Sequence, residues 1–225
     1  MPNVYSVSLG SVNAFLIDTD GLTLIDTGTE GSADAILDAI REIGRRPEDL
    51  DCILVTHCHA DHAGSLAELK RATGVEAHMH PLDAAMVREG KALRPLQPSP
   101  GLAKWLIFQI FIRPASATIQ PAKIEHEVND GDEIPVAGRM RAIHTPGHCA
   151  GQLSFLWPQE GGVLFAADAC SNIPRLGLAL GYEDLEEGRR SLRKLAQLDF
   201  EVACFGHGGA ITRGASRRFR KKWHT

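Results

Sequence analysis

Three histidines and one aspartate lie within six consecutive residues, 57–62 (HCHADH). In an extended segment, side chains two residues apart share a face, so His57 and His59 can point at one ion. Asp61 and His62 follow where the chain is expected to turn into a helix, so they approach from a different side. One ion does not easily accept all four groups at this spacing, whereas two neighbouring ions do. The stretch therefore predicts a metal site.

Three further candidate ligands lie far along the chain, each at the end of an expected strand. His148 is in the tight turn TPGH, Asp168 follows the apolar run VLFAA, and His207 lies in GHGG after VACF. Loops at strand ends are where an α/β scaffold usually presents a site, at one edge of its sheets. Taken singly, each residue fits a structural role. Together with residues 57–62, they indicate one site assembled from four loops.

These motifs carry a resemblance to a known family. LIDTG at 24–28, HxHxDH at 57–62, TPGH at 145–148, Asp168 and GH at 206–207 occur in the order typical of the metallo-β-lactamase superfamily. Together they span most of the chain, and the HxHxDH element is specific. The resemblance implies an α/β fold of the αββα sandwich type. Two mixed β-sheets would pack between helices, with the metals at one edge.

The resemblance also assigns the ligands between two divalent metal ions. The first ion would be bound by His57, His59 and His148. The second would be bound by Asp61, His62 and His207. Asp168 would bridge both ions, and Asp26 would hold the HxHxDH loop without binding metal. The inferred ligands are imidazoles and carboxylates, so zinc is expected, with iron or manganese as alternatives.

A dinuclear site of this kind implies hydrolysis. Two divalent ions, the carboxylates of Asp61 and Asp168, and a bridging hydroxide leave a small net positive charge, which favours an anionic transition state. Metal binding lowers the pKa of a water from ~15.7 towards ~7, so a hydroxide nucleophile is available at neutral pH. We expect it to attack a carbonyl carbon, while catalytic Asp61 orients the nucleophile or carries its proton.

The resemblance is closest to the glyoxalase II-like and lactonase-like branches, which favours a carbonyl ester, thioester or lactone as the substrate. A bridging carboxylate such as Asp168 is absent from the penicillin-hydrolysing branch, and diiron flavoproteins have Glu in place of His59. Glyoxalase II (hydroxyacylglutathione hydrolase) adds a helical domain, which is not expected in the 18 residues after His207. Lactonases usually carry Tyr just after the bridging Asp, where this chain has Ser171 and Asn172. A mononuclear iron enzyme of the persulfide dioxygenase type and a metal-dependent phosphodiesterase or nuclease stay as alternatives.

The elements that position these residues alternate between strands and helices. Short apolar runs predict strands at 4–9, 12–18, 22–26, 52–56, 75–78, 139–144, 152–156, 163–167 and 202–205. Helical spacing of apolar residues predicts helices at 33–43, 65–72, 81–89 and 185–198. No repeat or linker interrupts the pattern, so residues 1–225 are expected to form a single metallo-β-lactamase-fold domain.

One segment, residues 91–121, does not fit this rhythm and is expected to be an insertion. It carries five prolines and a run at 102–112 that is apolar nearly all round. A helix at 101–113 exposes more apolar surface than one partner can bury. Two interpretations stay open: the helix packs across the core or forms a homodimer interface, or it is a hydrophobic lid that selects substrates.

Composition narrows the class of protein further. The 225 residues are 44% hydrophobic and 23% charged, with a formal net charge of −4, so nucleic acid is not an expected partner despite the basic segment 213–222. The longest apolar run, 105–112, is too short to span a membrane, and the amino terminus lacks the pattern of a signal peptide. The five cysteines are scattered without a CxxC motif, which favours reduced thiols. A cytoplasmic enzyme acting on a small molecule is therefore expected.

Overall fold

The first half of the chain forms a six-stranded mixed sheet in the computed structural model, which describes residues 3–223. In spatial order its strands are β1 (Val4–Leu9), β2 (Val12–Asp18), β3 (Leu22–Ile25), β4 (Leu50–Leu54), β5 (Glu76–Met79) and β7 (His126–Glu127). The first three pair antiparallel, and the pairs from β3 to β7 are parallel. Only Asp51 of β4 is exposed, as expected for a central parallel strand covered on both faces.

The second half forms a five-stranded sheet. In spatial order its strands are β15 (Val202–Cys204), β11 (Val163–Phe165), β10 (Leu153–Trp157), β9 (Met140–His144) and β8 (Glu133–Ile134). β11 and β15 are parallel and the other pairs are antiparallel. Consequently β9, β11 and β15 point the same way, and their carboxyl ends lie at one edge.

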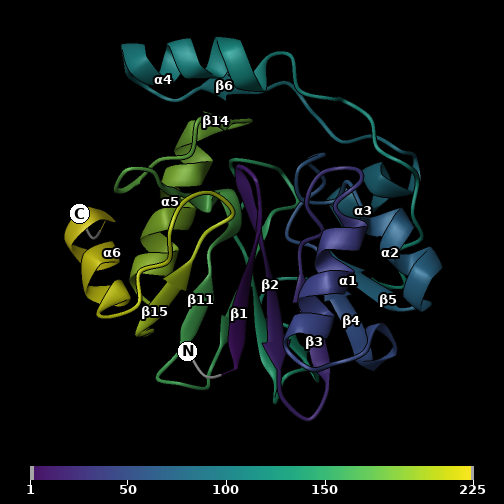
Figure 1. Ribbon diagram of the computed structural model, residues 1–225. Coiled ribbons are helices and arrows are strands. Elements are labelled where there is room, and N and C mark those ends of the chain that lie inside the picture. The colour runs from purple at the N-terminus through teal and green to yellow at the C-terminus, as the bar shows by residue number, and fades with distance from the viewer. Residues whose placement is uncertain (1–2, 224–225) are drawn as a thin grey trace.

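The two sheets pack face to face between two layers of helices (Figure 1). Phe15 of β2 and Phe165 of β11 meet across the interface, with ring centroids 5.4 Å apart. The helices that cover the first sheet are α1 (Ala33–Glu42), α2 (Leu66–Thr73) and α3 (Pro81–Arg88). Those that cover the second are α5 (Leu185–Ala196) and α6 (Ala215–Trp223). The predicted αββα sandwich is confirmed.

The ends of two strands differ from the sequence-based expectation, and both differences concern the site. β4 ends at Leu54, two residues before the predicted limit, so the chain is already irregular when it reaches His57. β11 ends at Phe165 and is followed by a short 3-10 turn, Ala167–Ala169, that contains Asp168. Apolar runs alone do not locate these ends, because the buried loops that follow the strands are apolar as well.

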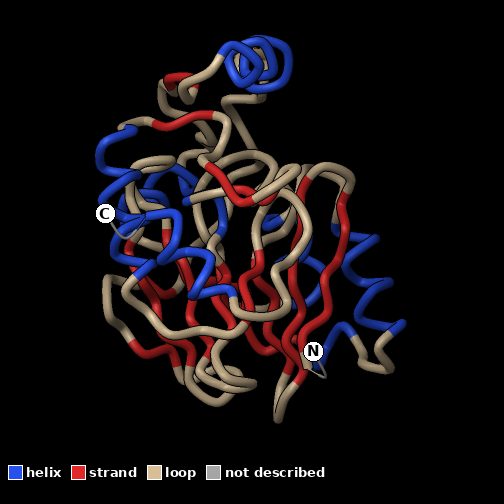
Figure 2. Tube along the Cα trace, turned by 90° about the vertical axis from the view of Figure 1, so that its left-hand side faces the viewer, coloured by secondary structure: helices blue, strands red, loops and turns tan. Residues whose placement is uncertain are grey.

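The insertion stands above one end of the sandwich, as Figures 1 and 2 show. It contains β6 (Gln97–Pro98), α4 (Leu102–Ile107) and a π-helical turn, Phe108–Ile112. The predicted helix at 102–112 is therefore one continuous helix whose hydrogen bonding changes part-way. β6 pairs with β14 (Gly181–Tyr182), which ties the insertion to the second half of the chain. In this helical segment only Phe108 is buried, whereas Leu102, Ile110 and Phe111 are 75%, 61% and 66% exposed.

The remaining regular elements are short. They are a 3-10 turn, Pro47–Asp49, and a strand pair formed by β12 (Ser171–Asn172) and β13 (Leu176–Gly177). All five cysteines are buried and free. Within residues 3–223, no helix has the length and apolar character needed to cross a bilayer.

Candidate metal centre

All seven predicted ligands meet at the edge where β4, β9, β11 and β15 end. Residues 57–62 form the loop after β4, and Asp168 lies in the turn after β11. His148 follows β9 and His207 follows β15. The two sheets therefore contribute loops to the same site. Its residues are separated by up to 150 positions in sequence and brought together by the packing of one sheet on the other.

Asp26 fixes the loop that carries four of these residues. Its Oδ1 accepts a hydrogen bond from the Thr56 backbone N–H at 2.8 Å, and its Oδ2 accepts one from the Thr56 hydroxyl at 2.9 Å. The same Oδ2 lies 2.8 Å from His62 Nδ1. Asp26 is only 2% exposed, so these contacts are made away from water. The predicted role of Asp26 in holding the loop agrees with these contacts.

Three imidazoles converge on one point. His59 Nδ1 lies 3.1 Å from His57 Nε2 and 2.9 Å from His148 Nε2. Ligand atoms on a tetrahedral zinc with ~2.05 Å bonds are ~3.3 Å apart, so the spacing fits three ligands of one ion. All three rings are buried.

A second group lies beside the first, and Asp168 stands between the two. Asp61, His62 and His207 offer ligand atoms within 4.8 Å of one another. Asp168 Oδ2 is 3.2 Å from His207 Nε2 and 3.6 Å from His148 Nε2, and its Oδ1 is 3.7 Å from His62 Nε2. One carboxylate thus faces both groups of histidines. The arrangement has the form of two adjacent cation sites that share a carboxylate.

In the part of the chain that the structure describes, two buried atoms at this junction have no hydrogen-bond partner, His62 Nε2 and Asp168 Oδ1. A buried polar atom without a partner costs about 1–3 kcal/mol, so two that face each other favour a shared cation. Gly206 lets both side chains approach each other, because a Cβ there would lie 2.3 Å from Asp168 Oδ1 and 2.6 Å from His62 Cε1. The donor set, the orphaned atoms and this close approach all fit divalent metal.

The electrostatics of the site separate its histidines into two kinds. Burial lowers the pKa of His57 and, to about 3, that of His59, and neighbouring imidazoles add to the shift. Burial also opposes charge on His62 and His207, but Asp61 and Asp168 raise the pKa of His62 to about 9 and that of His207 to about 12. His57 and His59 are therefore neutral at pH 7, whereas His62 and His207 hold protons in the metal-free protein.

The two carboxylates respond in the opposite direction. Burial alone would raise the pKa of Asp61 and of Asp168, but the charges of His62 and His207 lower both well below the usual range. Both groups are anionic at neutral pH. The site therefore presents neutral imidazole nitrogens on one side and carboxylate oxygens in the middle and on the other.

The ring nitrogens that face away from the junction are oriented by hydrogen bonds. His148 Nδ1 donates to the Gly181 carbonyl at 2.8 Å, and His207 Nδ1 donates to the Ser11 carbonyl at 2.7 Å. Because Nδ1 is held by these bonds, Nε2 of each ring points into the site and is the nitrogen available to an ion once it carries no proton. Such partners fix the tautomer and the ring orientation of metal-binding histidines.

The sequence profile of the metallo-beta-lactamase superfamily matches residues 7–207, most of the chain. The chain belongs to the metallo-β-lactamase superfamily. This assignment confirms the family resemblance and makes the protein a member of a family of metal-dependent hydrolases that bind divalent cations. The binding of metal by each of the seven residues stays a prediction.

Individual superfamily members are similar to the chain over most of its length. An uncharacterized protein of Bacillus subtilis (strain 168), YobT, is 28% identical over 95% of this chain and 90% of its own. A hydroxyacylglutathione hydrolase of Chelativorans sp. (strain BNC1) is 29% identical over 83% of this chain, but only 58% of its own length is covered. Among solved structures, the MIM-2 metallo-β-lactamase superposes with a TM-score of 0.72 at 28% identity, covering 98% of this chain and 78% of that one.

The superfamily motifs do not account for a buried network behind the first group of histidines. Asp83, fully buried on α3, accepts hydrogen bonds from the Cys58 backbone at 3.0 Å and from the Cys149 thiol at 3.0 Å. Arg94 of the insertion pairs with Asp83 at 2.8 Å and with Glu183 at 3.2 Å. The network joins the loops next to His57 and His148 to the insertion.

No local sequence pattern links positions 83, 94 and 183, so this network was not predicted. The Cys58 and Cys149 thiols are buried in the core between the first sheet and its helices, with their sulfurs 3.5 Å apart. A charged residue in the proline-rich segment just after α3 is the only signal that pointed towards Arg94.

Proposed function

We propose that the protein is a dinuclear metal-dependent hydrolase of ester, thioester or lactone bonds. His57, His59 and His148 hold the first ion; Asp61, His62 and His207 hold the second. The observation that carries the proposal is the position of Asp168, whose two oxygens face both groups of histidines at 3.2–3.7 Å. A shared carboxylate is expected where two ions are neighbours.

We expect zinc, with iron or manganese as alternatives, because imidazole and carboxylate donors suit all three. Two divalent cations supply an activated water at neutral pH and polarise the carbonyl oxygen of the substrate. The remaining chemistry belongs to the side chains. Asp168 and Asp61 stay anionic, because their pKa values are lowered well below the usual range, so they balance the charge of the cations.

Asp61 is the proposed catalytic residue. Its side chain is 37% exposed, whereas that of Asp168 is 7% exposed, so it is the carboxylate that faces entering solvent. Its Oδ2 lies 3.3 Å from His207 Nε2. Because the pKa of Asp61 is lowered, it is a weak base, and its role is to orient the attacking water by accepting a hydrogen bond at Oδ.

The first test is the hydrolysis of S-lactoylglutathione by the metal-replete protein. The similarity to a hydroxyacylglutathione hydrolase makes a thioester the first choice of substrate. We expect kcat/KM above ~10⁴ M⁻¹s⁻¹, a value typical of a proficient enzyme. Little turnover, with metal present, would direct the search to lactones and oxygen esters. One bound equivalent of iron with oxygen uptake would contradict the hydrolase and favour the dioxygenase.

Metal binding at the second group is expected to release protons. In the metal-free protein His62 and His207, with pKa values near 9 and 12, are protonated at pH 7, whereas His57 and His59 are neutral and the carboxylates ionised. Each charged histidine must lose one proton to offer its Nε2 to an ion. The apparent affinity for the second ion should therefore rise about 100-fold per pH unit between pH 6 and 8. Competition with a chromophoric chelator measures this slope, and a value near zero would contradict the assignment.

Self-association through the insertion helix stays a prediction. Its exposed apolar side chains, among them Ile110 and Phe111, form the kind of patch that marks a contact surface. We expect a homodimer at micromolar concentration in analytical ultracentrifugation, and a monomer for Phe111→Glu. A glutamate introduced on α6, Lys221→Glu, should leave the dimer intact. A wild-type monomer would exclude this interface.

A further inference from the structure

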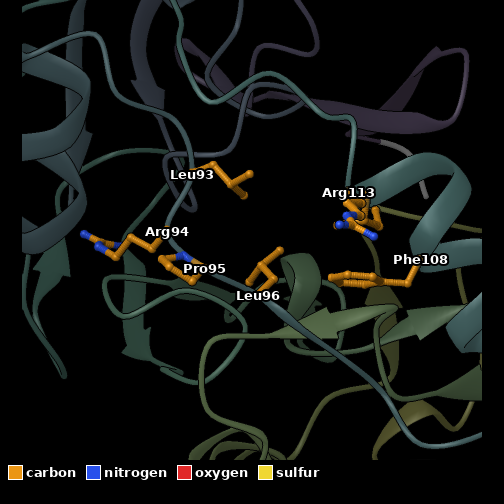
Figure 3. A pocket seen from close by; sticks show the side chains of 7 residues that line it. Leu93, Arg94, Pro95, Leu96, Phe108 and Arg113 are labelled. Carbon is orange, nitrogen blue, oxygen red and sulfur yellow. The ribbon is translucent and has the colours of Figure 1, made fainter.

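A pocket lies under the insertion helix, on the side opposite to its exposed apolar face. Figure 3 shows Leu93 and Leu96 on one side of the space, with Phe108 and Arg113 on the other. Pro95 and Ile112 complete the apolar part of the wall. The volume is about 290 Å³, at the lower limit of pockets that hold small ligands. The pocket therefore suits one short acyl chain or one aromatic ring.

The pocket adjoins the metal centre through two of its walls. The ring of Phe108 packs on Gly181 so closely that a Cβ there would lie 2.7 Å from Phe108 Cε2. The carbonyl of Gly181 is the acceptor for His148 Nδ1, so the Phe108 wall is one residue away from a predicted ligand. On the other side, Arg94 NH1 lies 3.3 Å from the sulfur of Cys149, the residue after His148. The segments that carry Gly181 and Cys149 therefore lie between the pocket and the predicted metal centre.

The two arginines of the pocket, Arg94 and Arg113, differ in whether carboxylates neutralise their charge. Arg94 points away from the space and is neutralised by Asp83 and Glu183 (Figure 3). Arg113 is exposed and bonds only to the neutral amide oxygen of Gln109, at 3.1 Å. Among residues 3–223, no carboxylate lies within 4.0 Å of the Arg113 guanidinium, whereas Arg94 has two. The pocket is thus apolar with one unbalanced positive charge at its rim.

We propose that this pocket binds the acyl chain of the substrate and that Arg113 selects chains with an anionic far end. The inference rests on the proposed hydrolase function, because it assigns the part of the substrate remote from the scissile bond. Leu93, Leu96 and Phe108 remove the methylene groups from water. Arg113 pairs with the terminal carboxylate, which a wholly apolar pocket would reject because burial of an unpaired charge is unfavourable. The expected substrates are short dicarboxylic half-esters or half-thioesters.

Binding is measured first, on the metal-replete protein and without turnover. The probe is 4-phenylbutane-1-sulfonate, because a sulfonate is a poor metal ligand and so reports the pocket; 4-phenylbutan-1-ol is its neutral counterpart. By calorimetry we expect Arg113→Gln to weaken sulfonate binding about fivefold to tenfold, as for loss of a partly exposed charged contact, and to leave the alcohol unchanged within twofold. Arg113→Lys should restore most of the affinity.

The matched control is Arg193→Gln, an exposed arginine on α5 outside the pocket, which should change neither dissociation constant. Equal affinity of the wild type for sulfonate and alcohol, or an equal effect of Arg113→Gln and Arg193→Gln, would overturn the proposal. Arg113 is exposed, so its replacement is not expected to unfold the protein.

Turnover then separates this inference from the proposed function. The substrates are the 4-nitrophenyl ester of hexanoate and the mono-4-nitrophenyl ester of adipate, which differ only in the terminal carboxylate. We expect the adipate ester to have the higher kcat/KM and to lose most of that advantage in Arg113→Gln. If both esters react equally and the variant changes neither, the inference fails while the hydrolase stands. If the probe binds as expected but no ester, thioester or lactone reacts, the hydrolase fails.

Discussion

Replacement of His59 by alanine is expected to abolish both metal retention and turnover. His59 Nδ1 is the central atom of the first group, 3.1 Å from His57 Nε2 and 2.9 Å from His148 Nε2. The change leaves two imidazoles where three converge and opens the buried space to water. Loss of a residue that only supports a ligand costs about 10–100-fold in metal affinity or activity, so loss of the ligand itself should exceed ~100-fold. Metal content after dialysis and kcat/KM on the preferred substrate measure the two effects.

A matched control is available because the chain carries histidines away from the site. His126 is exposed and pairs with Glu76 on the first sheet, so His126→Ala should retain both metal equivalents and full activity. Two equivalents of metal in His59→Ala, or full activity of metal-free protein, would disprove the assignment of His59 as a ligand.

Replacement of Asp26 by asparagine is expected to remove the second ion while the first stays bound. The backbone should tolerate the change, since Asp26 has a φ of 61° and asparagine adopts this conformation readily. With the amide oxygen still facing the Thr56 N–H, the amide NH₂ faces His62 Nδ1 and donates to it. The neutral imidazole must then carry its proton on Nε2, the atom that faces Asp61 and Asp168. A protonated Nε2 has no lone pair for a metal.

We expect the second equivalent to bind about 10–100-fold more weakly, with a similar loss of activity. Titration with zinc, followed by analysis of the metal content, separates the two equivalents. Asp38→Asn is the control, because Asp38 is an exposed aspartate on α1 that only pairs with Arg41. Equal affinity for both equivalents in Asp26→Asn and the wild type would show that Asp26 does not set the tautomer of His62.

The part of the site at residues 57–62 can be predicted from residue types and their spacing. The spacing rule for an extended chain groups His57 with His59 and separates them from His62. The structure has the same grouping, although these residues lie in an irregular loop after β4. The distal residues His148, Asp168 and His207 follow strands that sequence patterns also locate. Their convergence on residues 57–62 depends on how one sheet packs against the other. That convergence was therefore predicted from the family resemblance and not from the residue patterns.

The features that the sequence does not predict are contacts between distant segments, which depend on the geometry of individual side chains. The contact of Arg94 with Asp83 and Glu183 joins three segments whose residue types are ordinary in surface loops and helices. The π-helical turn at Phe108–Ile112 has no distinctive pattern, because its apolar residues also suit an α-helix. The alternative of a helix packed across the core was wrong for this segment, since only Phe108 is buried in it. The sequence also does not predict that the ring of Phe108 packs against Gly181.

The surroundings of Gly206 limit which substitutions the protein can accept at this position. Glycine is often required where the backbone has a positive φ that other residues avoid, but Gly206 is not among the glycines with positive φ. Its requirement comes from the close packing of the Asp168 and His62 side chains against it, because a single methyl group there would displace one of these predicted ligands. In a saturation library selected for function, position 206 should accept glycine alone, while Gly131, whose side faces open space, should accept asparagine. The side chains of the predicted metal site, and not the local backbone conformation, therefore restrict position 206 to glycine.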